Sequence, residues 1–109
     1  MTLPTRTTQV LEFVRQSAEA FGSPKRILLF GSRARGDHSD RSDYDIAVEP
    51  DAALNKNWVH FWSLVDEKAP TLSKIDLINL ADDLSESFRN QIETDGIDLL
   101  PKAKQHETK

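Results

Sequence analysis

Residues 29–48 read Leu-Phe-Gly-Ser-Arg-Ala-Arg-Gly-Asp-His-Ser-Asp-Arg-Ser-Asp-Tyr-Asp-Ile-Ala-Val, and this stretch decides the fold. The apolar run 26–30 that leads into it is short and bounded by turn residues, which is typical of a strand buried on both faces. Residues 32–36 favour a short helix with Ser32 as its N-cap. Between 44 and 48, Tyr, Ile and Val alternate with Asp and Ala, which predicts a second strand with one apolar face.

The flanking sequence alternates between helical and strand patterns. Apolar residues three to four positions apart predict helices, and alternating ones predict strands. The expected elements are a helix at 8–21, a helix at 54–65, a strand at 74–80, a helix opening at the capping-box pair Asp83 and Glu86 and ending at Gly96, and a short strand at 97–100. This order predicts an α/β fold in which the central strands lie side by side under packed helices.

Length and composition limit the class of protein. The 109 residues suit one domain, which we expect to span 1–100, with a disordered tail at 101–109. A net charge of −4 argues against direct nucleic-acid binding, and the absence of cysteine excludes disulfides and thiolate metal sites. Neither a secretory signal nor an apolar run of ~20 residues is present, so we expect a cytoplasmic protein without membrane association.

Two acids, Asp43 and Asp45, open the second predicted strand. Carboxylates at positions i and i+2 of a strand share one face, roughly 7 Å apart, and both can reach a divalent metal between them. Oxygen ligands without cysteine favour Mg²⁺ or Mn²⁺. On its own, however, Asp-x-Asp is more typical of a turn residue at 43 followed by an acid on a solvated strand edge.

The Gly31-Ser32 pair follows the first predicted strand and opens the short helix. Free backbone N–H groups at such a helix start favour phosphate, and a glycine lets the chain approach a ligand closely. Arg33 and Arg35 add cations that can neutralise phosphate charge. Taken alone, Gly-Ser is also an ordinary turn and the arginines an ordinary solvated face, so the combination with the two acids carries the argument.

Together, 29–36 and 42–48 resemble the Gly-Ser…Asp-x-Asp signature of the minimal nucleotidyltransferases, within the polymerase-β-like superfamily. The resemblance implies a small mixed β-sheet of three to four strands with helices packed on it. It also implies that Gly31, Ser32, Arg33 and Arg35 contact a nucleoside triphosphate and that Asp43 and Asp45 bind Mg²⁺. Asp76, on the third predicted strand, completes the catalytic and metal-binding set, either as a metal ligand or as the acceptor of a proton.

The same resemblance implies transfer of AMP from ATP to a hydroxyl, with a tyrosine of a small all-helical HEPN-type toxin as acceptor and the chain acting as its antitoxin in a hetero-oligomer. Two alternatives remain open. One is a non-catalytic module that neutralises a helical partner by contact, and the other is a transferase subunit acting on a small molecule.

Other polar and aromatic residues have simpler interpretations. His38 and His60 lack a partner at metal-ligand spacing, so a surface position is expected for both. Trp58, Phe61 and Trp62 cannot all face one sheet, and we expect part of this aromatic set to be exposed.

Overall fold

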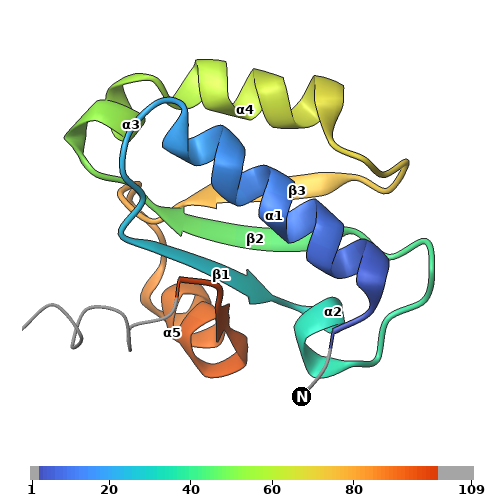
Figure 1. The fold of residues 1–109 in the computed structure, drawn as a ribbon. Coiled ribbons are helices and arrows are strands. Elements are labelled where there is room, and N and C mark those ends of the chain that lie inside the picture. The colour runs from blue at the N-terminus through green and yellow to red at the C-terminus, as the bar shows by residue number, and fades with distance from the viewer. Residues whose placement is uncertain (1–2, 101–109) are drawn as a thin grey trace, which may run out of the picture.

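The computed structural model describes residues 3–100, so the tail expected at 101–109 lies outside the described residues. A mixed four-stranded sheet carries helices on both faces (Figure 1), which confirms the expected architecture. Within the described range, no helix has the length and apolar character needed to cross a membrane. The elements are α1 (Thr5–Glu19), β1 (Arg26–Phe30), α2 (Ser32–Arg35), β2 (Tyr44–Glu49), α3 (Ala52–Lys56), α4 (Trp58–Lys68), β3 (Ile75–Asn79), α5 (Glu86–Asp95) and β4 (Ile97–Asp98).

Strand β2 lies inside the sheet, whose order is β3-β2-β1-β4. It pairs antiparallel with β1 and parallel with β3, and β4 pairs antiparallel with the other edge of β1. In this register Phe30 lies opposite Asp45, and Asp45 lies opposite Asp76. The pairing therefore places acids from two strands side by side, at the point where β1 ends.

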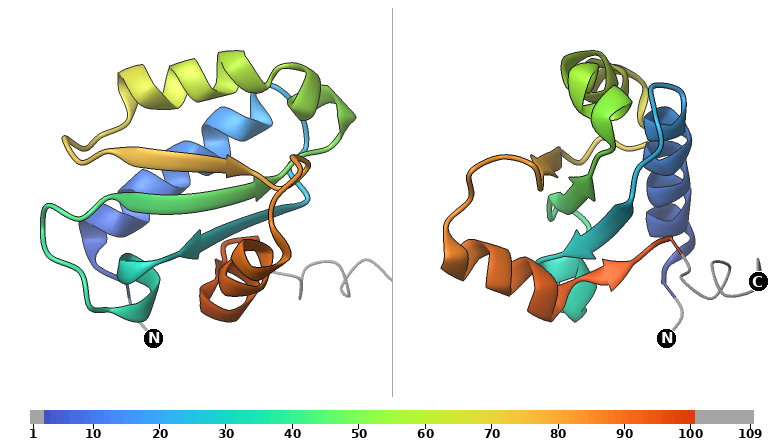
Figure 2. Two further views of the ribbon diagram at one scale, coloured as in Figure 1. Left: turned by 180° about the vertical axis from the view of Figure 1, so that it is seen from behind. Right: turned by 90° about the vertical axis from the view of Figure 1, so that its left-hand side faces the viewer.

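The two faces of the sheet carry different helices, with α1 and α4 on one and α5 on the other (Figure 2). Tyr44, Ile46 and Val48 are buried in the larger core, on the α1 and α4 face, as their alternation predicts. The opposite face is not simply solvated. There Ile92 of α5 lies in the same buried cluster as Ala47 of β2. Asp45 remains only partly buried, since it lies beyond that cover.

The single helix expected at 54–65 is instead two helices that meet at Asn57. This residue has φ −103° and ψ 20°, and it ends α3 and precedes α4. Its side-chain amide donates a hydrogen bond to the Ala53 carbonyl at 2.9 Å. A side chain that hydrogen-bonds to a carbonyl at the end of a helix competes with the backbone N–H that would continue the helix. The spacing of apolar residues therefore continues past Asn57 although the helix does not.

Two predicted helix-end signals are wrong. The N-cap of α2 is Gly31, not Ser32, which is the first residue of that helix. Ser85, not Asp83, caps α5, and its hydroxyl accepts a hydrogen bond from Phe88 N at 3.2 Å. A third signal is confirmed: α5 ends at Gly96, although this glycine has φ −66° and not the left-handed conformation of a typical C′ glycine. Its lack of a side chain matters for packing, because a Cβ there would lie 2.6 Å from the Ile92 carbonyl oxygen.

The neighbouring aromatics of α4 allow a matched stability test. Phe61 has no exposed surface, whereas Trp62 is 45% exposed. We expect Phe61→Ala to lower the free energy of unfolding by about 3–5 kcal/mol, because it leaves a cavity under α4. Trp62→Ala should cost less than about 1 kcal/mol. Urea unfolding followed by circular dichroism measures both, and equal losses would contradict this placement of α4.

Candidate functional site

A cavity of about 480 Å³ opens beside the end of β1, on the α5 face of the sheet. Five of the predicted site residues line it, together with an apolar and amide wall from the sheet and α5. The lining consists of Phe30, Gly31, Ser32, Arg35, Asp45, Asp76, Ile78, Phe88 and Gln91. The structure therefore gathers the glycine-serine turn and two of the three acids around one space.

Gly31 is fixed by its backbone and by its neighbour. It is buried and has φ 75°, a backbone conformation that residues with a Cβ rarely adopt. A Cβ at this position would overlap the Asp45 carboxylate, at Oδ2. The main chain between β1 and α2 thus passes directly against the acid, and only glycine permits this approach.

Asp45 and Asp76 are cross-strand neighbours whose charges repel. Burial raises the pKa of Asp45 above its usual value, and repulsion from Asp76 and Asp43 raises it further, while Arg35 opposes the shift. Lys74 forms an ion pair with Asp76 at 3.2 Å, and this contact raises the pKa of the Lys74 ammonium. A second cation between the two carboxylates would relieve the repulsion that remains.

Asp43 occupies a different position from the other two acids. It is exposed, precedes β2 and does not line the cavity, although its charge reaches Asp45 and Lys74. Within residues 3–100, no three His, Asp or Glu side chains lie close enough together to hold a metal ion by themselves. Mg²⁺ is usually bound by one or two carboxylates plus substrate phosphates and water, and the Asp45–Asp76 pair fits that donor set.

The two arginines of α2 diverge. Arg33 is buried and points away from the cavity, where its Nε and Nη2 donate to the Ser42 carbonyl at 3.1 and 2.9 Å. Its guanidinium lies 3.8 Å over the ring of Tyr44. Arg33 therefore holds the loop before β2, in contrast to the phosphate contact expected for it.

Arg35, by contrast, is exposed at the cavity. It pairs with Asp37 at 3.3 Å and with Asp95, on α5, at 3.2 Å. These surface pairs are weak enough to exchange for a bound anion, so the phosphate contact stays a prediction for Arg35.

Phe88 and Gln91 were missed by the sequence reasoning. They lie three positions apart on α5 and therefore on the same side of that helix, where both reach the cavity. Phe88 also packs edge-on against Phe30, with ring centroids 6.0 Å apart. The spacing alone is an ordinary amphipathic pattern, so only the position of α5 over the sheet identifies this wall.

His60 and the aromatic residues of α4 lie outside the cavity. His60 is exposed and stacks against Phe21, with ring centroids 6.3 Å apart. Of the aromatic set on α4, Phe61 is buried and Trp62 exposed, as expected.

Comparison with known proteins gives two findings. Residues 12–105 match the protein family described as Polymerase beta, Nucleotidyltransferase. Among solved structures, the chain is similar to one described as "Crystal structure of the toxin-antitoxin with AMP-PNP", with 23% identity and a TM-score of 0.58 over 96% of this chain and 80% of that one. This similarity shows a shared fold. No curated protein matches the sequence.

Two glycines with positive φ provide a matched pair for testing the turn. Gly36→Ala should cost about 1 kcal/mol of stability, because Gly36 is in the left-handed region. Gly31→Ala should cost more, because a φ of 75° with a ψ of −155° is a conformation that essentially only glycine adopts. Only Gly31→Ala displaces the Asp45 carboxylate, because no described residue has a heavy atom within 4 Å of a Cβ at Gly36. We expect Gly31→Ala to weaken Mn²⁺-ATP binding at least about tenfold in calorimetry. An equal loss in Gly36→Ala would sink this interpretation.

The raised pKa of Asp45 predicts how stability depends on pH in chelator. The folded protein binds this proton more tightly than the unfolded chain, so stability falls as pH rises from the ordinary value of 3.8 through the folded pKa. Asp45→Asn removes that loss and should raise the thermal midpoint at pH 7, with the gain vanishing near pH 3.8. Asp83→Asn, at an exposed position, is the control; a destabilised Asp45→Asn protein at pH 7 would refute the prediction.

Proposed function

The chain belongs to the polymerase-β nucleotidyltransferase family, and we propose that it transfers AMP from ATP to a hydroxyl group on a protein partner. The observation that carries the proposal is the cavity in which Gly31, Ser32 and Arg35 face the paired carboxylates of Asp45 and Asp76. One side of this cavity supplies phosphate-binding groups and the other supplies acids, the combination that phosphoryl chemistry requires.

In the proposed mechanism the turn at Gly31 holds the phosphates. The close backbone approach and the Ser32 hydroxyl supply neutral donors, and Arg35 exchanges its surface carboxylate partners for phosphate oxygens. Asp43 is more exposed than Asp45 and Asp76, and its negative charge helps to attract Mg²⁺ to them. Phe88 and Gln91 form the remaining wall.

Asp45 and Asp76 are the residues that would hold Mg²⁺. When bound, the ion supplies charge neutralisation at the phosphates and polarises the attacking and leaving oxygens. The acceptor oxygen attacks the α-phosphorus, the bond from that phosphorus to the oxygen bridging the β-phosphate breaks, and pyrophosphate leaves. Where Asp76 does not bind the ion, its side chain, partly exposed at the cavity, would instead receive the acceptor's proton.

For the acceptor, we propose a tyrosine on an all-helical toxin of the HEPN type, with this chain as its cytoplasmic antitoxin. The similar structure is described as a toxin–antitoxin with AMP-PNP, which is a non-hydrolysable ATP analogue, and this supports both a toxin partner and an adenine nucleotide. The cavity is open beside the end of β1, so a partner that brings its own hydroxyl can reach it.

The test is to co-express the chain with the product of the adjacent gene, add ATP and Mg²⁺ to the purified complex, and weigh both proteins by intact mass spectrometry. We expect the partner to gain one or more AMP groups. Asp45→Asn/Asp76→Asn should slow the gain by at least about a hundredfold, because the cation site is lost. Asp83→Asn, an exposed acid outside the cavity, should retain the wild-type rate.

Each contrary result identifies an alternative. A stable complex that neutralises the toxin without any mass change, and equally well in the double variant, would support a binding module that acts by contact. Absence of any complex, with AMP transfer to an added small hydroxyl compound, would instead support a small-molecule transferase.

A further inference from the structure

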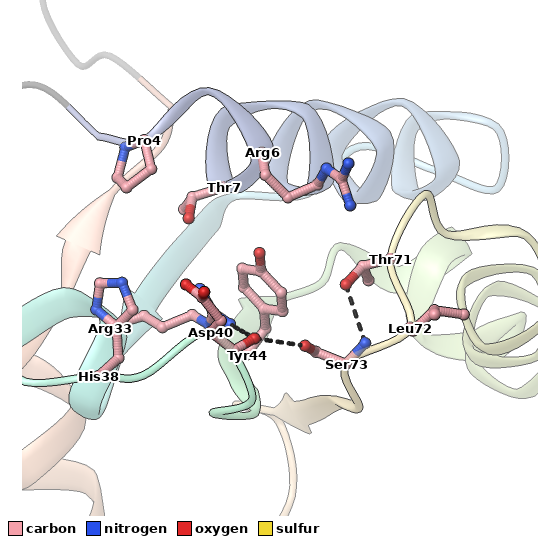
Figure 3. Close-up of a pocket in the computed structure, with 10 residues that line it drawn as sticks. All are labelled: Pro4, Arg6, Thr7, Arg33, His38, Asp40, Tyr44, Thr71, Leu72 and Ser73. Atoms are coloured by element: carbon pink, nitrogen blue, oxygen red, sulfur yellow. Dashed lines mark hydrogen bonds between the residues drawn. The ribbon is translucent and has the colours of Figure 1, made fainter.

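A second polar cavity, of about 390 Å³, lies on the opposite face of the sheet (Figure 3). It is bounded by the first turn of α1, the loop between α2 and β2, and the segment 71–73 before β3. Tyr44 contributes to its floor, whereas its neighbour Asp45 lines the first cavity. Because successive strand residues point to opposite faces, the two cavities are separate spaces on either side of β2.

Several polar groups around this cavity have no partner. Thr7 and Tyr44 are each only 1% exposed, and in the described part of the chain neither hydroxyl forms a hydrogen bond. Figure 3 shows both side chains directed into the space between α1 and the loops. The Nδ1 atom of His38 is also shielded from solvent without a hydrogen-bond partner. Among the described residues His38 Nδ1 is the fully shielded atom of this set, whereas the two hydroxyls border the cavity. A ligand in the cavity would give all three groups a hydrogen-bond partner.

The charge around the cavity favours an anion. The first turn of α1, a helix of 15 residues, has neither a side-chain cap nor an acidic residue, so the positive end of the helix dipole is not neutralised there. Arg6 and Arg33 add guanidinium groups, and Nη1 of Arg33 has no hydrogen bond among the described residues. Asp40 is the opposing charge in the lining, and within residues 3–100 its backbone carbonyl forms hydrogen bonds whereas its carboxylate forms none.

We propose that this second cavity binds a small oxyanion of the phosphate class, such as inorganic phosphate or pyrophosphate. The hydroxyls of Thr7 and Tyr44, His38, and the guanidinium of Arg6 provide the hydrogen-bond and charge contacts that such an ion needs. The volume accommodates either ion. This inference does not depend on the transferase activity proposed above.

The experiment titrates the ¹⁵N-labelled protein with inorganic phosphate and, separately, with pyrophosphate. We expect saturable shifts of the Arg6 and Thr7 amides with at least one of the two ions, and the ion that binds identifies the source. Thr7→Val and Arg6→Ala should each weaken binding by about fivefold or more. Arg41→Ala, which removes an exposed arginine outside both cavities, should leave the affinity unchanged.

Further variants distinguish loss of binding at the second cavity from misfolding and from binding in the first cavity. Asp40→Asn should tighten binding, a gain that damage to the fold cannot produce. Thr7→Val should not lower the thermal midpoint without ligand, because it replaces an unpartnered buried hydroxyl by a methyl group. The proposal is overturned if neither ion shifts the α1 amides, or if binding is lost in Arg35→Ala and unaffected in Thr7→Val and Arg6→Ala.

Discussion

The side-by-side placement of the Asp45 and Asp76 carboxylates on β2 and β3 is the constraint on which the rest of the structure depends. Parallel pairing of these strands requires a crossover, which α3 and α4 provide on the far face of the sheet. The acids can then remain at the end of the other face, beyond the cover of α5. Their mutual repulsion is tolerated because Lys74 and Arg35 lie beside them and solvent reaches both.

The two faces of the sheet divide stability from chemistry. The larger core lies under α1 and α4, where Tyr44, Ile46 and Val48 are packed between helix and sheet. The smaller core under α5 contains Phe30 and Ala47, and it ends where the acids begin. A small domain is thus able to keep a repulsive pair of carboxylates, because most of its apolar burial occurs elsewhere.

Local pattern predicted which segments form helices and strands, and it identified the turn and acids that meet at the cavity. It could not supply strand register, because the pairing of Asp45 with Asp76 joins positions far apart in sequence. Nor could it separate Arg33 from Arg35, whose difference depends on the side of α2 that faces the loop. The apolar spacing does not predict the break at Asn57 or the cap at Ser85, because it does not indicate which side chain forms a hydrogen bond with the backbone at a helix end.

The alternation of Tyr44 and Asp45 has a consequence for how sequences of this kind can diverge. The ladder with β1 begins at Asp45 and the ladder with β3 begins at Tyr44. Insertions and deletions in the loop before Tyr44 therefore leave the pairing intact, provided that Arg33 still reaches the loop carbonyls. One residue gained or lost inside β2 would exchange the faces of the strand, turning an aromatic ring toward the cavity beside α5 and an acid into the core. The length of the loop can therefore change during evolution, whereas the number of residues in β2 from Tyr44 onward cannot.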